Sequence, residues 1–229
     1  MTGREGPVVT LDGPAGSGKS TTAKEVARRL GLRHLDSGAL YRALTFALLE
    51  AGVPESEWER LGVDALGALG VELAATAEGF EVRLGERVLT NELRGPRVTD
   101  RVALLARLPA ARACLLDLQR GAGARGRLVA DGRDMGTVVF PNADLKVYLV
   151  ADLEERARRR LREVGTAAPS AKELAQQVGA IEHRDRIDSG RDISPLRRPD
   201  GAMEIDTTRL SFEEQVSAIV DLARRLTVP

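Results

Sequence analysis

The sequence predicts an α/β fold: a five-stranded parallel, doubly wound sheet with a phosphate-binding loop (P-loop), a small β-containing insertion and a helical lid. Two observations predict the sheet. Short apolar runs alternate with helical segments along most of the 229-residue chain, which is the pattern of βαβ units. A Gly-rich turn also joins the first apolar run to the first helix, which is where such folds bind phosphate.

The five strands are short runs that are apolar or end in Asp. They cover residues 8–12, 33–36, 127–131, 145–150 and 203–206. The first and third are followed by Gly13 and Gly132, and the second by Ser37-Gly38. Such runs, bounded by turn residues, indicate buried parallel strands.

The helices between the strands are marked by apolar spacing and by caps. Apolar residues at 23, 26, 27 and 30 line one helical face that stops at Gly31, and residues 39–51 form a helix that stops at Gly52. Asp152-x-x-Glu155 predicts a capping box that opens an Arg-rich helix to about 164. Ser211-x-x-Glu214 predicts the same device at the start of the last helix.

One region interrupts the alternation. Residues 80–84 and 87–90 alternate in polarity around Gly85-Glu86, which predicts a hairpin. We therefore expect a β insertion over 63–95, a lid over 156–191 with a loop at 167–170, and a core made of 1–62, 96–155 and 192–229.

Composition excludes several classes of protein. Lys+Arg and Asp+Glu are both 34 and aromatic residues are 3%, so we expect neither a nucleic-acid partner nor a basic stripe for polyanions. The single cysteine, Cys114, permits no internal disulfide and fits a reducing compartment. Because no apolar run approaches 18 residues and residues 1–7 contain no signal-peptide core, we expect a cytoplasmic protein without membrane contact.

The most specific motif is a complete G-x-x-x-x-G-K-S sequence between the first strand and the first helix. Its backbone N–H groups and the helix N-terminus are suited to phosphate oxygens. Lys19 is expected to reach the β- and γ-phosphates, and Ser20 to hold Mg²⁺. The predicted ATP- or GTP-binding residues are Gly13, Pro14, Ala15, Gly16, Ser17, Gly18, Lys19, Ser20 and Thr21.

The rest of the chain favours a small kinase. The only asparagines, Asn91 and Asn142, do not belong to an Asn-Lys-x-Asp segment, which disfavours a GTPase. Residues 36–42 and 131–134 follow strands, and residues 184–191 precede the last one; all three segments mix carboxylates with arginines. Acceptors bind at the carboxyl ends of parallel strands, and such a mixture suits an acceptor with an anionic end and a hydrogen-bonding end.

Three motifs together resemble bacterial cytidylate kinases: DGPAGSGKST at 12–21, LDSGALYR at 35–42 and ADGRDMGTVVFPNA at 130–143. The resemblance extends from about residue 8 to about 226. It implies transfer of the γ-phosphoryl group of ATP to CMP or dCMP in pyrimidine nucleotide metabolism, by a monomer. It also implies that the β insertion belongs to the nucleoside-monophosphate-binding region.

The resemblance also implies roles for individual residues. Ser37 and Asp134 contact the amino edge of cytosine, Arg112 and Arg191 donate to its acceptor atoms, and Asp188 holds the ribose hydroxyls. Arg42, Arg133 and Arg184 clamp the acceptor phosphate. The Arg-rich helix resembles the lid of such kinases. Its Arg156 and Arg160 are four residues apart and share a face, so both are expected to point at the phosphates of ATP. The expected catalytic residues are Lys19, Arg133, Arg156, Arg160 and Arg184.

The expected chemistry needs no general base, because the acceptor oxygen is already anionic. His34 and His183 are therefore expected to be structural or exposed, and Asp131 and Asp36 to lie in the second shell around Mg²⁺. Two alternatives remain open. One is a P-loop kinase with another acceptor (UMP, dTMP, AMP, a coenzyme precursor or a small hydroxyl compound); for a hydroxyl acceptor, Asp36 would be the base. The other is a regulatory module that binds ATP without transferring phosphate.

Overall fold

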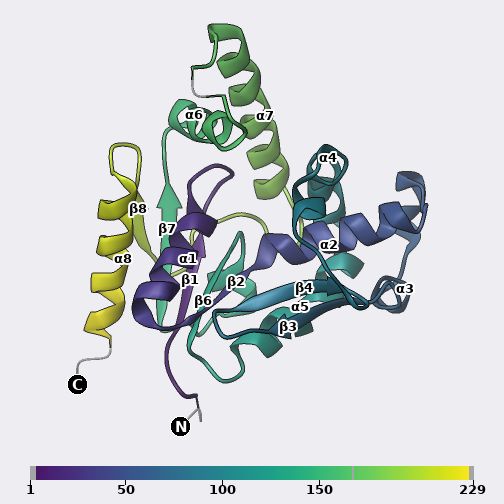
Figure 1. Ribbon diagram of the computed structural model, residues 1–229, viewed down its shortest axis with the longest axis horizontal. Coiled ribbons are helices and arrows are strands. Elements are labelled where there is room, and N and C mark those ends of the chain that lie inside the picture. Colours follow the sequence, from purple (N-terminus) through teal and green to yellow (C-terminus); the bar gives the residue numbers. More distant parts are fainter. Residues whose placement is uncertain (1–3, 167, 227–229) are drawn as a thin grey trace.

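The computed structural model describes residues 4–166 and 168–226 (Figure 1). The predicted loop at 167–170 therefore falls partly outside the described residues. The main sheet is five-stranded and parallel, with the order β2-β6-β1-β7-β8. Its strands are β1 (Val8–Asp12), β2 (Arg33–Asp36), β6 (Leu128–Gly132), β7 (Leu145–Val150) and β8 (Met203–Asp206).

Four of these strands have the predicted bounds, and β6 starts and ends one residue later than predicted. Arg127, the expected first residue of β6, has a φ of 52°. This left-handed conformation is incompatible with a strand. The predicted fold class is confirmed.

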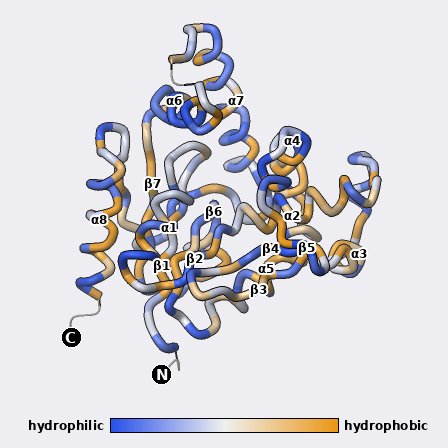
Figure 2. The backbone as a smooth tube through the Cα atoms, in the orientation of Figure 1, coloured by the Kyte–Doolittle hydropathy of each residue, from blue (hydrophilic) through white to orange (hydrophobic). Residues whose placement is uncertain are grey.

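Both faces of the sheet are covered by helices (Figure 1). Alternate residues of β1 pack on opposite sides: Val8 belongs to the cluster with α2 (Ser37–Glu50) and α5 (Pro109–Gly123). Val9 and Leu11 belong to the cluster with α1 (Lys19–Leu30) and α8 (Phe212–Arg225). Apolar and polar stretches alternate along α8 (Figure 2), which accounts for its position on the edge of the core.

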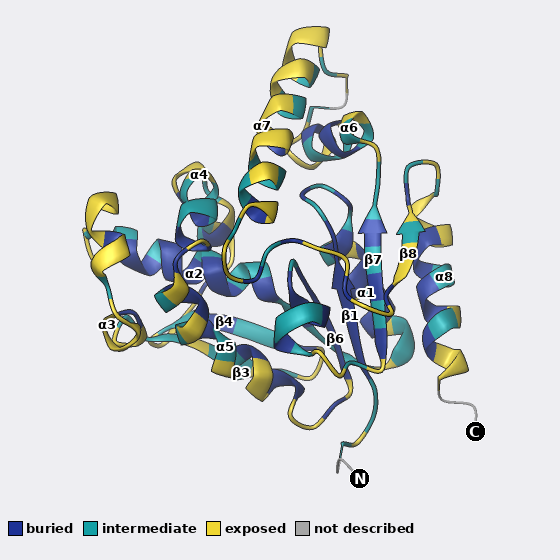
Figure 3. Ribbon diagram, turned by 180° about the vertical axis from the view of Figure 1, so that it is seen from behind, coloured by how far each residue is buried: buried dark blue, intermediate teal, exposed yellow. Residues whose placement is uncertain are grey.

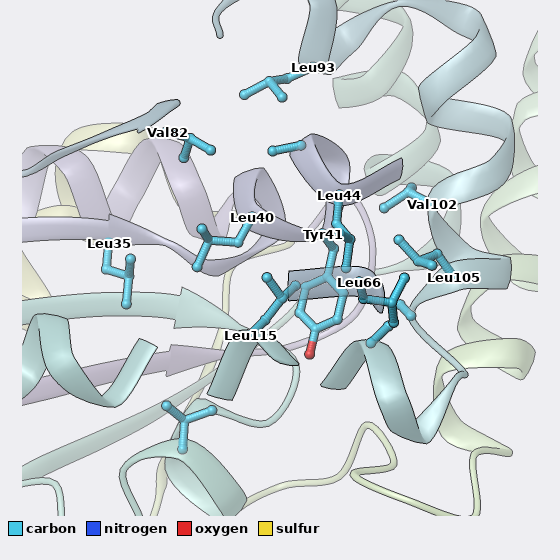
Figure 4. Close-up of a cluster of buried hydrophobic side chains, with 14 of the residues drawn as sticks. Leu35, Leu40, Tyr41, Leu44, Leu66, Val82, Leu93, Val102, Leu105 and Leu115 are labelled. Atoms are coloured by element: carbon cyan, nitrogen blue, oxygen red, sulfur yellow. The ribbon is translucent and has the colours of Figure 1, made fainter. Parts of the chain in front are cut away.

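The larger hydrophobic core holds α2, which directly follows strand β2. Leu40, Tyr41 and Leu44 of α2 are buried together with Leu105 and Leu115 (Figure 4). Helix α2 starts at Ser37, two residues earlier than predicted, because the Asp36 side chain accepts a hydrogen bond from Ala39 N at 3.1 Å and caps the helix. This packing holds Ser37 and Arg42 at fixed places at the sheet edge.

The insertion is a three-stranded antiparallel sheet with the order β3-β4-β5. The predicted hairpin is confirmed as β4 (Phe80–Leu84) and β5 (Arg87–Val88), and its turn contains Gly85 at a φ of 58°. Strand β3 (Val71–Ala75) was not predicted. The remaining short elements are η1 (Glu55–Arg60), α3 (Val63–Gly67), η2 (Asn91–Arg94), α4 (Pro96–Leu105) and the π-turn η3 (Met135–Val139).

Helices α6 (Leu153–Glu163) and α7 (Ala171–Ser189) project beyond the sheet, and the outer turns of α7 are exposed (Figure 3). The capping box predicted at Ser211 is confirmed. The one predicted at Asp152 is wrong: the Asp152 side chain makes no cap hydrogen bond, and Glu155 binds Arg159 and Arg162 instead. Within residues 4–166 and 168–226, no helix is both long and apolar enough to cross a bilayer.

Candidate active site

The P-loop follows the fully buried strand β1 and leads into α1. Glycine is required at its start, since a Cβ on Gly13 would lie 2.2 Å from the carbonyl oxygen of Leu149. Gly16 and Gly18 have φ values of 74° and 85°, which L side chains rarely adopt. No acidic residue lies in the first turn of α1, so the positive end of the helix dipole faces the loop uncompensated and suits an anion.

Lys19 is folded onto this loop. Its ammonium donates to the carbonyl oxygen of Pro14 at 2.7 Å and to Ser17 Oγ at 3.3 Å. Burial, and then the nearby charge of Arg133, lower the pKa of Lys19 well below its ordinary value. A bound phosphate would favour the charged form of Lys19, so the loop is electrostatically suited to an anionic ligand.

The hydroxyl of Ser20 and the carboxylate of Asp131 form an oxygen-rich pair at the start of α1. Ser20 Oγ donates to Asp131 Oδ2 at 2.5 Å, and His34 Nε2 lies 2.8 Å from Asp131 Oδ1. Asp36 lies close by, and burial and the charge of Asp131 raise its pKa. Oxygen ligands fit Mg²⁺; in the part of the chain that the structure describes, no cluster of three His, Cys, Asp or Glu forms a self-contained metal cage. His34, expected to be structural or exposed, contacts a carboxylate of the site.

A cavity of about 1580 Å³ lies beside the P-loop. It is bordered by the carboxyl ends of β2 and β6, which is where ligands bind in parallel α/β sheets. Lys19, Ser20 and Arg160 line it. All eight predicted acceptor residues also line this cavity: Ser37, Arg42, Arg112, Arg133, Asp134, Arg184, Asp188 and Arg191.

One end of the cavity is built from buried polar groups. Arg112 of α5 forms an ion pair with Asp134, and the two residues are 7% and 4% exposed. The Arg112 guanidinium also lies 5.4 Å from the centroid of the Tyr41 ring and donates to Ala106 O at 3.0 Å. These contacts fix a planar donor and a carboxylate side by side, an arrangement suited to the edge of a base.

Gln119 belongs to this end and was missed by the sequence analysis. It is 1% exposed, and its Nε2 donates to Ser37 Oγ at 2.8 Å. A signal was present: Gln119 is seven residues after Arg112, on the face of α5 that otherwise buries Leu115 and Ala122. A polar residue on an apolar helical face indicates a specific partner.

Another part of the cavity is rich in arginine. Asp188 accepts from Arg133 Nε at 2.8 Å and forms an ion pair with Arg191. Burial opposes the charge of Asp188, but Arg133 and Arg191 outweigh it and lower its pKa. Burial lowers the pKa of both Arg42 and Arg184 to about 10. Arg133 and Arg191 thus share one carboxylate in their ion pairs, and Arg42 and Arg184 form no ion pair among the described residues. This leaves positive charge available for an anionic group.

Three of the arginines that line the cavity each have a donor atom without a hydrogen-bond partner among the described residues. The Nε atoms of Arg112, Arg184 and Arg191 are buried without a partner among the described residues. A buried donor without a partner is costly unless a ligand uses it. These atoms therefore support binding of an acceptor molecule in the cavity.

The two arginines expected on one face of α6 have different surroundings. Arg160 lines the cavity and donates to Glu163 at 2.8 Å. Arg156 lies behind the P-loop: its NH1 donates to the carbonyl oxygen of Ala15 at 3.0 Å, and it forms an ion pair with Asp185.

One cavity thus joins the P-loop to a buried Arg–Asp pair suited to the edge of a base and to a group of arginines suited to phosphate. This combination defines a P-loop kinase of the nucleoside monophosphate type. Sequence comparison identifies the particular family. The chain matches the cytidylate kinase family over residues 9–225. It therefore belongs to that family, as its three motifs predicted.

Individual proteins similar to this chain carry the same family name. A cytidylate kinase from Exiguobacterium sp. is 44% identical over 212 residues, covering 92% of this chain and 93% of that protein. One from Geobacillus thermodenitrificans is 42% identical over 215 residues, covering 93% and 95%. A bifunctional pantoate ligase/cytidylate kinase from Synechococcus sp. is 44% identical over 220 residues, covering 95% of this chain but 44% of that protein. The chain thus spans less than half of the bifunctional relative.

Proposed function

We propose that the protein phosphorylates CMP or dCMP in this cavity, with ATP bound on a donor side and the monophosphate bound on an acceptor side. The observation that supports this most directly is that the P-loop and all eight predicted acceptor residues line the same cavity. A shared cavity allows the γ-phosphate of ATP and the phosphate of the acceptor to meet.

On the donor side, the proposal assigns the phosphates of ATP to the N–H groups of the P-loop, to Lys19 and to Arg160. Ser20 would hold Mg²⁺, with Asp131 and Asp36 beside it. When bound, Mg²⁺ neutralises charge on the β- and γ-phosphates. The 2.5 Å contact between Ser20 and Asp131 supports this assignment, because it gathers oxygen atoms where the first turn of α1 meets the loop.

On the acceptor side, the cytosine amino group donates to Asp134 and Ser37, and Arg112 and Arg191 donate to the acceptor atoms of the base. A carboxylate accepts from the amino group of cytosine, whereas the oxygen of uracil at the same position is another acceptor. Asp188 accepts from the ribose hydroxyls. Arg42, Arg133 and Arg184 bind the acceptor phosphate.

No general base is needed in this scheme, because the attacking phosphate oxygen is already anionic. Rate enhancement then comes from positioning and from the positive charges of Lys19 and the arginines around the transferring group. Water must be excluded, since it would otherwise accept the phosphoryl group. We assign that task to closure of the lid over 156–191 and of the insertion over 63–95 in a monomeric enzyme.

The test is ADP release from ATP and Mg²⁺ with a panel of acceptors: CMP, dCMP, UMP, AMP, GMP, dTMP and none. Turnover that is highest with CMP and dCMP, and near zero without acceptor, is the expected result. Higher turnover with another monophosphate would overturn the base contacts assigned here. ATP binding without transfer to any acceptor would favour a regulatory module.

A further inference from the structure

Arg156 lies at the junction between the P-loop and the two projecting helices, α6 and α7. Its guanidinium has three acceptors: NH1 donates to Ala15 O at 3.0 Å, Nε donates to Ala151 O at 3.0 Å, and the group pairs with Asp185 of α7. Arg156 is 8% exposed. Arg156 therefore donates its hydrogen bonds to other groups of the protein and does not line the cavity.

Asp185 completes the same arrangement from the other helix. Its Oδ1 accepts from the backbone N–H of Ala15 at 2.9 Å, while Oδ2 pairs with Arg156. Both backbone polar groups of Ala15 are thus bound by side chains of α6 and α7. The N–H of Ala15, counted by the sequence among the phosphate-binding groups, points instead at a carboxylate.

Apolar packing supports the junction. Ala15 is buried against Ala157 of α6 and Ile181 of α7. A Cβ on Gly16 would lie 3.0 Å from the carbonyl oxygen of Arg156, so the backbones of the loop and of α6 approach closely there. The tip of the P-loop is consequently held by α6 and α7 as well as by the sheet.

We propose that Arg156 and Asp185 are positioning residues that clamp α6 and α7 to Ala15, and so set where Arg160 and Arg184 lie relative to the P-loop. Arg160 is one turn after Arg156 on α6, and Arg184 directly precedes Asp185 on α7. Both of these neighbours line the cavity. The clamp thus ties Arg160 and Arg184 to the P-loop through one turn of α6 and one residue of α7, and it leaves the outer turns of α7 outside the contact. This inference rests on the proposed donor side and gives Arg156 an indirect role in place of a phosphate contact.

The test compares Asp185→Asn, Arg156→Met and the double variant. In Asp185→Asn the side-chain oxygen can still accept from Ala15, but the new amide nitrogen faces the guanidinium of Arg156 as donor against donor. We expect each single change to raise both the KM for ATP and the Kd for ADP, measured by calorimetry, about tenfold, with a lower kcat. The double variant should be no worse than either single one, because both remove one clamp. The ratio of CMP to UMP turnover should not change.

The matched control is Arg158→Met on the same helix, because the Arg158 side chain is 48% exposed and pairs with Glu154. It should leave all these constants unchanged. If Asp185→Asn leaves the KM for ATP and the Kd for ADP unchanged while Arg156→Met raises them, Arg156 contacts phosphate directly and the clamp is refuted. Unchanged constants in both folded variants would refute it as well.

Arg156→Lys keeps the test decisive if Arg156→Met does not fold. A point-like ammonium cannot reach three acceptors that a guanidinium fork spans, so we expect an intermediate rise in the Kd for ADP; a wild-type value would contradict the clamp. Because ADP binding is measured without any acceptor, the clamp is tested even if CMP proves not to be the substrate.

Discussion

Replacing Asp134 by asparagine should change which pyrimidine the enzyme accepts. Asp134 is buried and paired with Arg112. In Asp134→Asn, Arg112 still requires an acceptor and holds the amide oxygen, so the amide NH₂ is left facing the base. That donor opposes the amino group of cytosine and matches the oxygen of uracil.

The size of the effect follows from the bond that is lost. A hydrogen bond to a charged group contributes about 1.5–3 kcal/mol, and about 1.4 kcal/mol corresponds to a factor of ten. We therefore expect kcat/KM for CMP to fall by about 10- to 100-fold, while kcat/KM for UMP rises. Asparagine is preferable to alanine, because its amide oxygen still accepts a hydrogen bond from the buried Arg112. Alanine would leave the guanidinium without that acceptor, and removing one partner of a buried ion pair costs about 3–5 kcal/mol of stability.

The assay is ADP release at saturating ATP with CMP or UMP varied. Asp117→Asn, an exposed position on α5, is the control that changes the same functional group away from the cavity. The KM for ATP should stay within about twofold in both variants. A folded Asp134→Asn enzyme with the wild-type ratio of CMP to UMP turnover would refute the base-reading role.

Three further predictions concern the loop and the core. Lys19→Ala should lower kcat by at least about 100-fold in a folded protein; near-normal turnover in steady-state assays would refute the P-loop assignment. Burial raises the pKa of Asp12 to about 7. Between about pH 4 and about pH 7 the folded state keeps a proton that the unfolded state releases, so the urea midpoint of unfolding should fall as the pH rises across this range. Asp12→Asn should make the midpoint depend less on pH, and an unchanged pH dependence would contradict the raised pKa. Leu44→Ala should cost about 3 kcal/mol in urea unfolding, against less than about 0.5 kcal/mol for exposed Leu226→Ala.

Most of the sheet could be predicted because each strand is one short continuous run in the sequence, and because the inner strands β1 and β6 are buried along their whole length. Strand β3 could not, because Val71–Ala75 is only partly buried and contains two alanines at its end. Its identity as a strand depends on pairing with β4, which begins after the four-residue connection 76–79. The capping box predicted at Asp152 was wrong because the sequence pattern does not show which partner a side chain takes. Glu155 stands at the required position, but two arginines of the same helix bind its carboxylate instead.

The candidate site was predictable as a set of residues and less so as a set of contacts. The three motifs contain Ser37, Arg42, Arg133 and Asp134, and the family resemblance supplied the other four acceptor residues. All eight line one cavity. Helical spacing placed Arg156 and Arg160 on the same face, yet it could not separate them. What separates them is Asp185, 29 residues away, whose carboxylate reaches Arg156 only in the folded chain.

The carboxylates assigned to the acceptor also hold the arginines in place without it. Asp134 pairs with Arg112, and Asp188 binds both Arg133 and Arg191. These pairs keep buried guanidinium groups from mutual repulsion and fix their orientation before substrate arrives, which lowers the ordering cost of binding. Because the Nε atoms of Arg112 and Arg191 remain without partners in the described structure, these two arginines can each still donate a hydrogen bond. Binding of the acceptor can therefore add hydrogen bonds without first breaking the ion pairs, so the site is preorganised for a ligand that brings acceptor atoms and negative charge.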